Sequence, residues 1–350
     1  MLSIGCDFHS RFQQIAMLDG QTGKVMERRL EHATGEARAF YAGLPGPARV
    51  GMEATGYAQW FEALLAEQGH ELWVGDAAEI HAAKVRKQKT DSRDACHLLD
   101  LLLQNRFPRI WIPSPQERDV RQLLRHRYKL ICSRTSVMNQ LHALAMGQGV
   151  CRKQKLWTAA GRRELESLAL GPWASRRRGA LLQMLDWFDA SLQELDQAVM
   201  EEAHSRPAAV RLMEHSGIGP VTALSLVLTV GPIERFEKSK QLVSYLGLNP
   251  RESSSGGKQR LGSISKQGNS MLRSLLVEAA QTASRYDLEL RRHYLRLKFR
   301  RGSGVAKVAI ARKLVVRLYW KLREQVSSVP PARTQGSPGN FLVESTPSAK

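Results

Sequence analysis

The stretch SIGCDFHS (residues 3–10) decides the expected fold, because it is the first of five short strand-like runs. Two further runs, at 13–19 and 24–30, follow it across turns and together predict a meander. Strands then alternate with helices, which is typical of a mixed α/β sheet with flanking helices. The later elements are expected at 34–44 (helix), 48–54 (strand), 57–68 (helix), 70–76 (strand), 78–86 (helix) and 91–105 (helix).

Four acidic residues in this unit occupy positions that a single site could share. Asp7 lies inside the first strand, and Glu53 closes the strand RVGMEATG (49–56). Asp91 and Asp94 open the last helix in KTDSRDACHLLDLLL (89–103), and their three-residue spacing puts both on one helical face. That face continues into Ala95, Leu98, Leu99 and Leu102, so we expect both carboxylates to point toward the core.

Each of these acids taken alone has an ordinary explanation. Most acidic residues are solvated surface groups, and an Asp at a helix start such as Asp91 is a common N-cap. The order strand Asp, strand Glu, helix Asp-x-x-Asp is more specific than any single residue. Oxygen ligands that converge from distant chain positions suit Mg²⁺, with Mn²⁺ as an alternative, and paired Mg²⁺ ions often serve phosphodiester chemistry.

Positive charge is concentrated outside this unit. The formal net charge is +19, yet residues 1–110 carry 13 Lys and Arg against 14 Asp and Glu, and the other residues carry 39 against 19. Residues 285–325 alone hold 13 basic and 3 acidic side chains. The distribution suits a polyanion, and because the basic positions surround helices with their own apolar stripes, it favours nucleic acid over a membrane surface.

Composition also limits where the protein is expected to work. No apolar run approaches the roughly 20 residues of a membrane span, and MLSIGCDF lacks the features of a signal peptide. The four cysteines, Cys6, Cys96, Cys132 and Cys151, form no C-x-x-C pair, which indicates reduced thiols. We expect a cytoplasmic, nucleoid-associated protein of a bacterium or archaeon.

Four segments are expected along the chain. Residues 1–110 form the α/β unit, and the proline-rich FPRIWIPSPQE ends it. Residues 111–206 are expected to be helical, 207–325 a second, mainly helical domain, and 326–350 a Pro/Ser/Gly-rich disordered tail.

Two apolar stripes run through the helical segment 111–206. One consists of Leu124, Tyr128, Ile131, Met138 and Leu141, and the other of Leu181, Leu185, Phe188, Leu192, Leu195 and Val199. The second has the alternating spacing of a coiled coil, although an ordinary bundle helix shows it too over so short a length. We expect an antiparallel helix pair or a contact between protomers.

Two motifs in the C-terminal domain suggest contacts with phosphate. HSGIGPVTALSL (215–226) resembles a helix-hairpin-helix, in which Gly217, Gly219 and Pro220 would form the turn and offer backbone N–H groups to a DNA backbone. A plain helix–helix turn is the alternative. In the basic helix at 303–325, Val308, Ala311, Val315, Leu318 and Leu322 are expected to pack inward, leaving Arg312, Lys313, Arg317 and Lys321 for a nucleic-acid partner.

The segment NPRESSSGGKQRLGSISKQGN (249–269) is expected to be a long polar loop between apolar helices. A flexible linker is one interpretation, but long loops inside compact domains are often functional. A serine beside glycines and cations is a possible nucleophile toward a phosphodiester. Lys258, Arg260 and Lys266 would then balance the charge of the transition state.

Together these motifs resemble the DEDD transposases of the insertion-sequence one-ten family, which includes the Piv-type DNA invertases. The resemblance is carried by IGCDFHS, GMEATGY, KTDSRDA, SGIGPVTALSL and the stretch 241–280, which appear in the family's order over roughly 1–110 and 210–285. The chain departs from the family in LTVGPIERF (228–236), where an acidic pair is frequent.

The resemblance implies a RuvC-like, RNase H-type N-terminal domain whose Asp7, Glu53, Asp91 and Asp94 bind Mg²⁺. It also implies a serine nucleophile just before glycine, Ser255, with Ser254 as the less favoured choice. Family members use a guide RNA from their own element to choose DNA. They are expected to act as homo-oligomers, dimers or tetramers, so the site could be completed across protomers.

The function expected from the sequence is therefore Mg²⁺-dependent DNA transposition or site-specific recombination, in which the serine attacks the phosphodiester and conserves it as a covalent ester. Two alternatives remain open at this point. One is a RuvC-like Holliday-junction endonuclease that uses water as its nucleophile. The other is a non-catalytic nucleic-acid-binding protein descended from a transposase, which the complete set of four acids disfavours.

Overall fold

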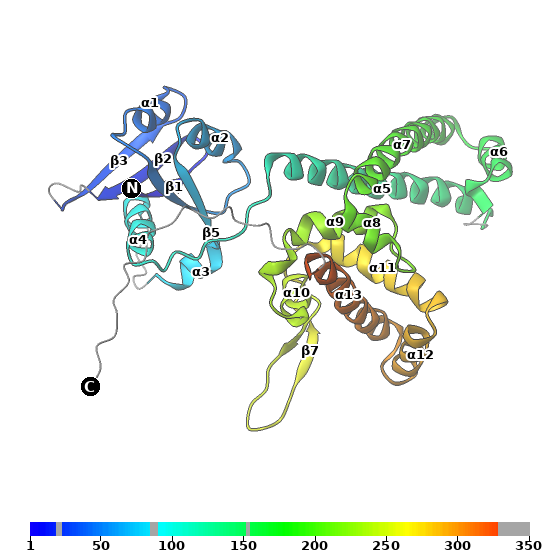
Figure 1. The fold of residues 1–350 in the computed structure, drawn as a ribbon. Helices are drawn as coiled ribbons and strands as arrows, with labels where there is room; N and C mark the ends of the chain where they lie inside the picture. Colours follow the sequence, from blue (N-terminus) through cyan, green and yellow to red (C-terminus); the bar gives the residue numbers. More distant parts are fainter. Residues whose placement is uncertain (19–22, 85–89, 152–154, 328–350) are drawn as a thin grey trace, which may run out of the picture. The chain divides into compact units, whose positions relative to one another are not determined.

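The computed structural model describes residues 1–18, 23–84, 90–151 and 155–327 (Figure 1). By its internal packing the chain divides into two compact units, Met1–Ile112 and the chain from Pro113 onward. Residues 328–350, most of the expected tail, lie outside the described residues. None of the described helices combines the length and the apolar character needed to cross a membrane.

The N-terminal unit is built on one five-stranded mixed sheet, as expected from the sequence. Its strand order is β3-β2-β1-β4-β5. The first three strands pair antiparallel, whereas β4 and β5 run parallel to β1. The strands are β1 (Leu2–Phe8), β2 (Phe12–Leu18), β3 (Val25–Glu31), β4 (Ala48–Glu53) and β5 (Glu71–Gly75).

Helices cover both faces of this sheet. Even-numbered residues of β1 and β4, such as Ile4 and Met52, pack against α1 (Glu36–Ala42) and α2 (Gln59–Glu67). The opposite face receives α3 (Ala77–Ala82) and α4 (Asp91–Leu103). The stripe expected to face inward on α4 is buried throughout, namely Ala95, Leu98, Leu99 and Leu102. Because strand side chains alternate between faces, odd-numbered residues of β1 and β4 point toward α4.

A glycine lets α4 approach β1 closely. A Cβ atom on Gly5 would lie 2.1 Å from the carbonyl oxygen of Ala95 and 2.4 Å from the nitrogen of Leu99. Both are backbone atoms of α4, so no side-chain rotation could relieve the overlap. Gly5 therefore sets how near the first turn of α4 lies to the end of β1, where Asp7 stands.

The second unit begins with two long helices that pack together. They are α5 (Pro115–Gly147) and α7 (Pro172–His204), joined through η1 (Lys155–Trp157) and α6 (Ala159–Ser167). Ion pairs join Arg127 to Asp196 and Arg134 to Asp189. The later residue of α5 therefore contacts the earlier residue of α7. The helices are thus antiparallel, and the expected stripe on α7 is buried or partly buried, whereas Tyr128 of α5 is exposed.

The C-terminal helices share a core with the ends of this pair. They are α8 (Pro207–Met213), α9 (Pro220–Val230), η2 (Ile233–Arg235), α10 (Ser239–Tyr245), α11 (Ser270–Tyr286), α12 (Leu288–Arg301) and α13 (Ser303–Ser327). Leu124 of α5 and Val199 and Ala203 of α7 belong to the same buried cluster as these helices. Packing is therefore continuous across residue 206, where the sequence suggests a boundary.

The segment expected to be a polar loop contains a β-hairpin instead. Strand β6 (Pro250–Glu252) pairs antiparallel with β7 (Leu261–Ile264), and the hairpin extends away from the helices of its unit (Figure 1). Its tip is a two-residue turn, with Gly256 and Gly257 at φ 57° and 74° and a hydrogen bond from the N–H of Lys258 to the carbonyl of Ser255. Positive φ at both central residues defines a type I′ turn, for which a glycine pair is well suited.

We predict that Gly5→Ala destabilises the N-terminal unit by at least about 2 kcal/mol, because the added methyl group overlaps the backbone of α4. The lowest-temperature unfolding transition of the full chain, followed by calorimetry, measures the effect. Gly56→Ala is the matched control, since a Cβ atom there meets nothing within 4 Å. Equal melting of the two variants would show that α4 does not depend on Gly5.

Candidate metal centre and nucleic-acid interface

Asp7 and Glu53 lie on neighbouring parallel strands at the same edge of the sheet. Cys6 of β1 is in register with Met52 of β4, so the next residue of each strand is the acid. Both acids have odd numbers, which places them on the face that carries α4. Asp7 is partly buried, whereas Glu53, the last residue of β4, is exposed.

Asp91 and Asp94 lie in the first turn of α4, at this same face. The N-cap is Thr90, whose side chain accepts a hydrogen bond from the N–H of Arg93 at 3.3 Å. Asp91 is therefore not needed as the cap of α4. Acidic side chains in a first turn also interact favourably with the helix dipole, so this position tolerates two carboxylates.

Asp7, His9 and Asp91 form one compact group. Nε2 of His9 lies 3.1 Å from a carboxylate oxygen of Asp7 and 3.6 Å from one of Asp91. One ligand atom from each residue lies within 4.8 Å of the other two, close enough for all three to contact one cation. Within the described residues, Glu53 and Asp94 are not part of this group.

Asp94 instead contacts a lysine. Nζ of Lys84 lies 2.8 Å from a carboxylate oxygen of Asp94, and both side chains are mostly buried. An ammonium group at this distance partly neutralises the carboxylate. Lys84 directly precedes residues 85–89, which lie outside the described part of the chain.

Electrostatic strain is concentrated on Asp7. Burial raises the pKa of the Asp7 carboxyl, contacts with His9 lower it, and the charges of Asp94 and Asp91 raise it further; the net shift is upward. The carboxylate form of Asp7 is thus disfavoured by low solvation and by two like charges. A divalent cation would relieve both effects, so the residues fit a metal ion chemically.

Sequence reasoning missed His9 and Lys84. The signal for His9 was available, since residues two apart in a strand share a face and Asp7 and His9 are so spaced. Lys84 gave no such signal, because its contact with Asp94 depends on how the end of α3 meets α4. The arrangement can hold a divalent cation at the carboxyl ends of β1 and β4.

The serine positions lie at the tip of the β6–β7 hairpin. Ser255 is exposed and directly precedes the turn formed by Gly256 and Gly257. Ser254 is held differently, because its hydroxyl donates to Glu252 at 2.6 Å and accepts from the N–H of Arg260 at 3.2 Å. Lys258, Arg260 and Lys266 are also exposed and belong to the same hairpin region.

The expected turn at 217–220 is present between α8 and α9. Gly217 has a φ of 88°, and a Cβ atom there would lie 2.6 Å from the carbonyl oxygen of Ala279 in α11. Gly219 is the N-cap of α9 and Pro220 its first residue. The first of these glycines thus has a packing role, whereas the second lies at a helix N-terminus.

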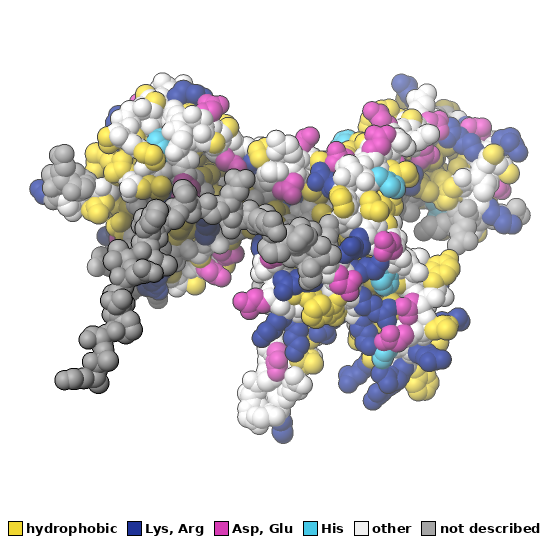
Figure 2. Space-filling model, in the orientation of Figure 1, with side chains coloured by type: hydrophobic (Ala, Val, Ile, Leu, Met, Phe, Trp, Pro, Cys, Tyr) yellow, Lys and Arg dark blue, Asp and Glu magenta, His cyan; other side chains and the backbone are white. Residues whose placement is uncertain are grey.

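Lysine and arginine side chains gather over α12 on one face of the molecule (Figure 2). On α13, two of the four side chains expected to contact nucleic acid already have protein partners. Arg317 pairs with Asp287 and Glu289, and Lys321 donates to Glu214 at 2.7 Å and to the carbonyl of Arg211 at 3.2 Å. These two side chains connect α13 to neighbouring helices. Their acidic partners lie at the start of α12 and at the end of α8.

Arg312 and Lys313 remain candidates for contact with a partner. Arg312 is partly exposed and Lys313 is exposed, and neither forms an ion pair among the described residues. The stripe beneath them is buried at Ala311, Val315, Leu318 and Leu322, as expected, and Val308 is partly buried.

Two family models match this chain, and the first extends past the N-terminal unit through α5. Residues 4–147 match the family model of the DEDD transposases of the IS110 type. Residues 209–295 match the model described as transposases of the IS116/IS110/IS902 family. The two matches lie in the order expected from the sequence motifs.

Similar proteins match over most of their length. A probable family 20 transposase of Pseudomonas aeruginosa is 28% identical over 91% of this chain and 96% of its own. The transposase for insertion sequence element IS1111A of Coxiella burnetii is 29% identical over 89% of this chain and 86% of its own. The transposase for insertion sequence element IS1328 of Yersinia enterocolitica is 26% identical over 82% of this chain. The two family models and these relatives together show that the chain belongs to the IS110 family of DEDD transposases, enzymes that cleave and transfer DNA.

Proposed function

We propose that this transposase moves its insertion sequence by Mg²⁺-dependent strand cleavage and exchange, with Ser255 as the nucleophile and an element-encoded RNA as the guide. The observation that carries the metal part is the group formed by Asp7, His9 and Asp91, with Asp94 in the same helical turn as Asp91 and Glu53 on the neighbouring strand. Family membership supplies the reaction class, the movement of DNA.

Asp7, Asp91, Asp94 and Glu53 would hold the metal, with Mn²⁺ able to replace Mg²⁺. Bound there, the metal would polarise the phosphodiester and stabilise the leaving oxygen. A cation there would stabilise the charged form of Asp7, which burial and the neighbouring carboxylates disfavour. His9 would hold the Asp7 side chain in position, and Lys84 would do the same for Asp94.

Ser255 would attack phosphorus through its side-chain oxygen. The bond from phosphorus to the departing sugar oxygen breaks as the bond to Oγ forms, the serine proton passes to water, and the sugar oxygen takes a proton from water. One phosphoester replaces another, so the strand can be rejoined without ATP.

The hairpin tip supports Ser255 over Ser254. The adjoining glycines carry no side chains that would block a DNA backbone, and Lys258 lies across the turn, where its charge could stabilise the pentavalent phosphorus. The hydroxyl of Ser254 is occupied by Glu252 and by the N–H of Arg260. Arg260 and Lys266 would contact phosphates along the hairpin.

Contacts with the nucleic-acid backbone are proposed at two further places. The α8–α9 turn would act as a helix-hairpin-helix, with N–H groups near Gly219 directed at phosphate and Gly217 shaping the turn. Arg312 and Lys313 would extend the basic surface of α12. The guide RNA and a dimeric or tetrameric assembly, with the helix pair α5–α7 as a coiled-coil-like contact, follow from the family resemblance and the basic surface alone.

Replacing Asp7 with Asn should lower cleavage of element ends at least about a hundredfold, because it removes a metal ligand. Folding should hold or improve. The pKa of Asp7 is raised in the folded protein, so its ionised form destabilises the fold. The free energy of unfolding should therefore increase as the pH falls through the pKa that Asp7 has in the folded protein. Because Asn does not titrate, Asp7→Asn should abolish this increase.

Cleavage assays and thermal unfolding from pH 4 to 8 without divalent ions check this, together with stabilisation by added Mg²⁺. Asp100→Asn, which changes an exposed acid on the same helix, is the control. An active or unfolded Asp7→Asn protein would remove the metal-site assignment.

Replacing Ser255 with Ala should keep nucleic-acid binding and Mg²⁺ binding but abolish strand exchange. Wild-type protein denatured during reaction should carry a DNA strand on the peptide that contains residues 253–258, detected by mass spectrometry. Ser253→Ala and Ser254→Ala are matched controls on the same hairpin and should retain the adduct. Cleavage by Ser255→Ala with no adduct in the wild type would instead establish the water-using endonuclease.

Replacing Arg312 and Lys313 together with Gln should flatten the slope of log K against log salt by roughly two units, since each would release counterions from a phosphate. Lys321→Gln is the control, because Lys321 is already paired with Glu214 and should leave the slope nearly unchanged. Fluorescence anisotropy with labelled DNA at several salt concentrations gives the slope. Equal slopes for wild type and the double variant would show that Arg312 and Lys313 are solvated surface residues that do not contact the DNA.

A further inference from the structure

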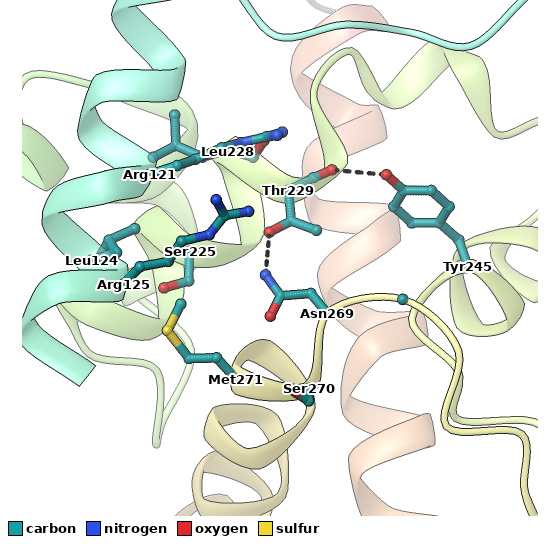
Figure 3. A pocket seen from close by; sticks show the side chains of 11 residues that line it. Arg121, Leu124, Arg125, Ser225, Leu228, Thr229, Tyr245, Asn269, Ser270 and Met271 are labelled. Atoms are coloured by element: carbon teal, nitrogen blue, oxygen red, sulfur yellow. Dashed lines mark hydrogen bonds between the residues drawn. The ribbon is translucent and has the colours of Figure 1, made fainter. Parts of the chain in front are cut away.

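A pocket of about 460 Å³ lies inside the second unit, and Ser255 is not among the residues that line it (Figure 3). Its walls come from α5, the middle and end of α9, Tyr245 of α10 and the first residues of α11. These segments are distant in sequence but belong to one compact unit. No role described above uses this space.

The lining is cationic. It contains Arg121 and Arg125 of α5 and, among the described residues, no carboxylate. Arg121 is held in place by donating from Nε to the carbonyl of Leu228 at 3.0 Å. Burial lowers the pKa of Arg121, and the charges of Arg125 and Arg235 lower it further, although Tyr245 and Glu117 act in the opposite direction. Positive charge is therefore crowded at this site, and an anion would relieve it.

Neutral hydrogen-bond donors face the same space. Ser225 of α9 is 1% exposed, and its Oγ has no hydrogen-bond partner. Serines inside helices usually bond to the carbonyl four residues earlier, and a buried hydroxyl without a partner is costly. Ser225 thus offers a donor that an oxygen atom of a ligand could satisfy.

The N-terminus of α11 also opens onto the pocket through Ser270 and Met271. The side chain of the cap, Asn269, accepts from the N–H of Leu272 at 3.1 Å. The N–H groups of the first two residues therefore have no partner within the helix. The amide of Asn269 is oriented by a 3.4 Å contact with Oγ1 of Thr229, and Figure 3 shows it pointing into the pocket together with the guanidinium of Arg125.

We propose that this pocket binds a backbone phosphate of the nucleic acid on which the transposase acts. The inference rests on the proposed function only in assuming that a nucleic-acid strand is the partner. Arg125, at the exposed mouth, the hydroxyl of Ser225 and the start of α11 supply donors from three directions, which suits a tetrahedral anion. Leu124 and Met271 give the pocket an apolar wall for the adjoining sugar, and the volume exceeds what one phosphate needs.

Charge removal at the mouth tests the pocket. Binding of a labelled oligonucleotide of random sequence, single-stranded and duplex, is measured by anisotropy with the full chain. Arg125→Gln should weaken the affinity roughly tenfold relative to Lys129→Gln. Lys129 is exposed one turn further along α5 and does not line the pocket, so the control loses the same charge on the same helix. Equal affinities of the two variants would overturn the proposal.

A variant that changes no charge distinguishes binding in the pocket from a general effect of positive charge on affinity. Ser225→Ala should hold or raise the unfolding temperature, because it removes a buried hydroxyl that has no partner, and should weaken oligonucleotide binding a few-fold with an unchanged salt slope. Unchanged affinity, with folding intact, would overturn the role of Ser225 and with it the proposed site.

Competition with inorganic phosphate shows whether the pocket binds a phosphate of the nucleic acid or a free anion. At matched ionic strength it should compete with the oligonucleotide for wild type and compete less for Arg125→Gln. If phosphate raises the unfolding temperature of wild type, yet Arg125→Gln binds the oligonucleotide as well as Lys129→Gln does, the pocket holds a free anion and the proposal fails. Asp7→Asn should retain full oligonucleotide binding, so loss of the metal site and loss of this pocket remain distinguishable.

Discussion

The close approach of α4 to β1 at Gly5 is the constraint on which the N-terminal unit depends. A close approach of their backbones brings carboxylates of a strand and a helix that are distant in sequence into one region. Gly5 permits this contact, and the buried face of α4 maintains it through Ala95 and Leu99. Backbone packing thus positions the site, and short aspartate side chains on β1 and α4 suffice to form it.

That packing creates an electrostatic conflict. Asp7 is partly buried beside Asp91 and Asp94, so its charged form is disfavoured, while His9 and Lys84 each offset part of the repulsion. A fold that gathers like charges in low solvation trades stability for affinity toward a cation. The same principle with the opposite sign operates in the helical unit, where Arg121 and Arg125 line one pocket.

Much of this architecture was predictable because it follows local rules. Period-two apolar runs located the strands, and parallel neighbours put Asp7 and Glu53 at one edge. Contacts set by tertiary packing were not predictable. The pairing of Lys321 with Glu214 joins distant helices, and the contact of Lys84 with Asp94 depends on the entry to α4. The hairpin was missed because its strands are polar and lack alternation, although Gly256 and Gly257 carried the turn signal.

The shared core of the helical unit limits how such enzymes can be recombined in the laboratory. Because Leu124, Val199 and Ala203 pack among the C-terminal helices, an exchange of parts between relatives at residue 206 would cut through a hydrophobic core. Chimaeras joined near residue 112, where the two compact units meet in sequence, would keep each interior intact. In such chimaeras α5 and α7 would stay with the C-terminal helices whose core they share, together with the hairpin and its serine.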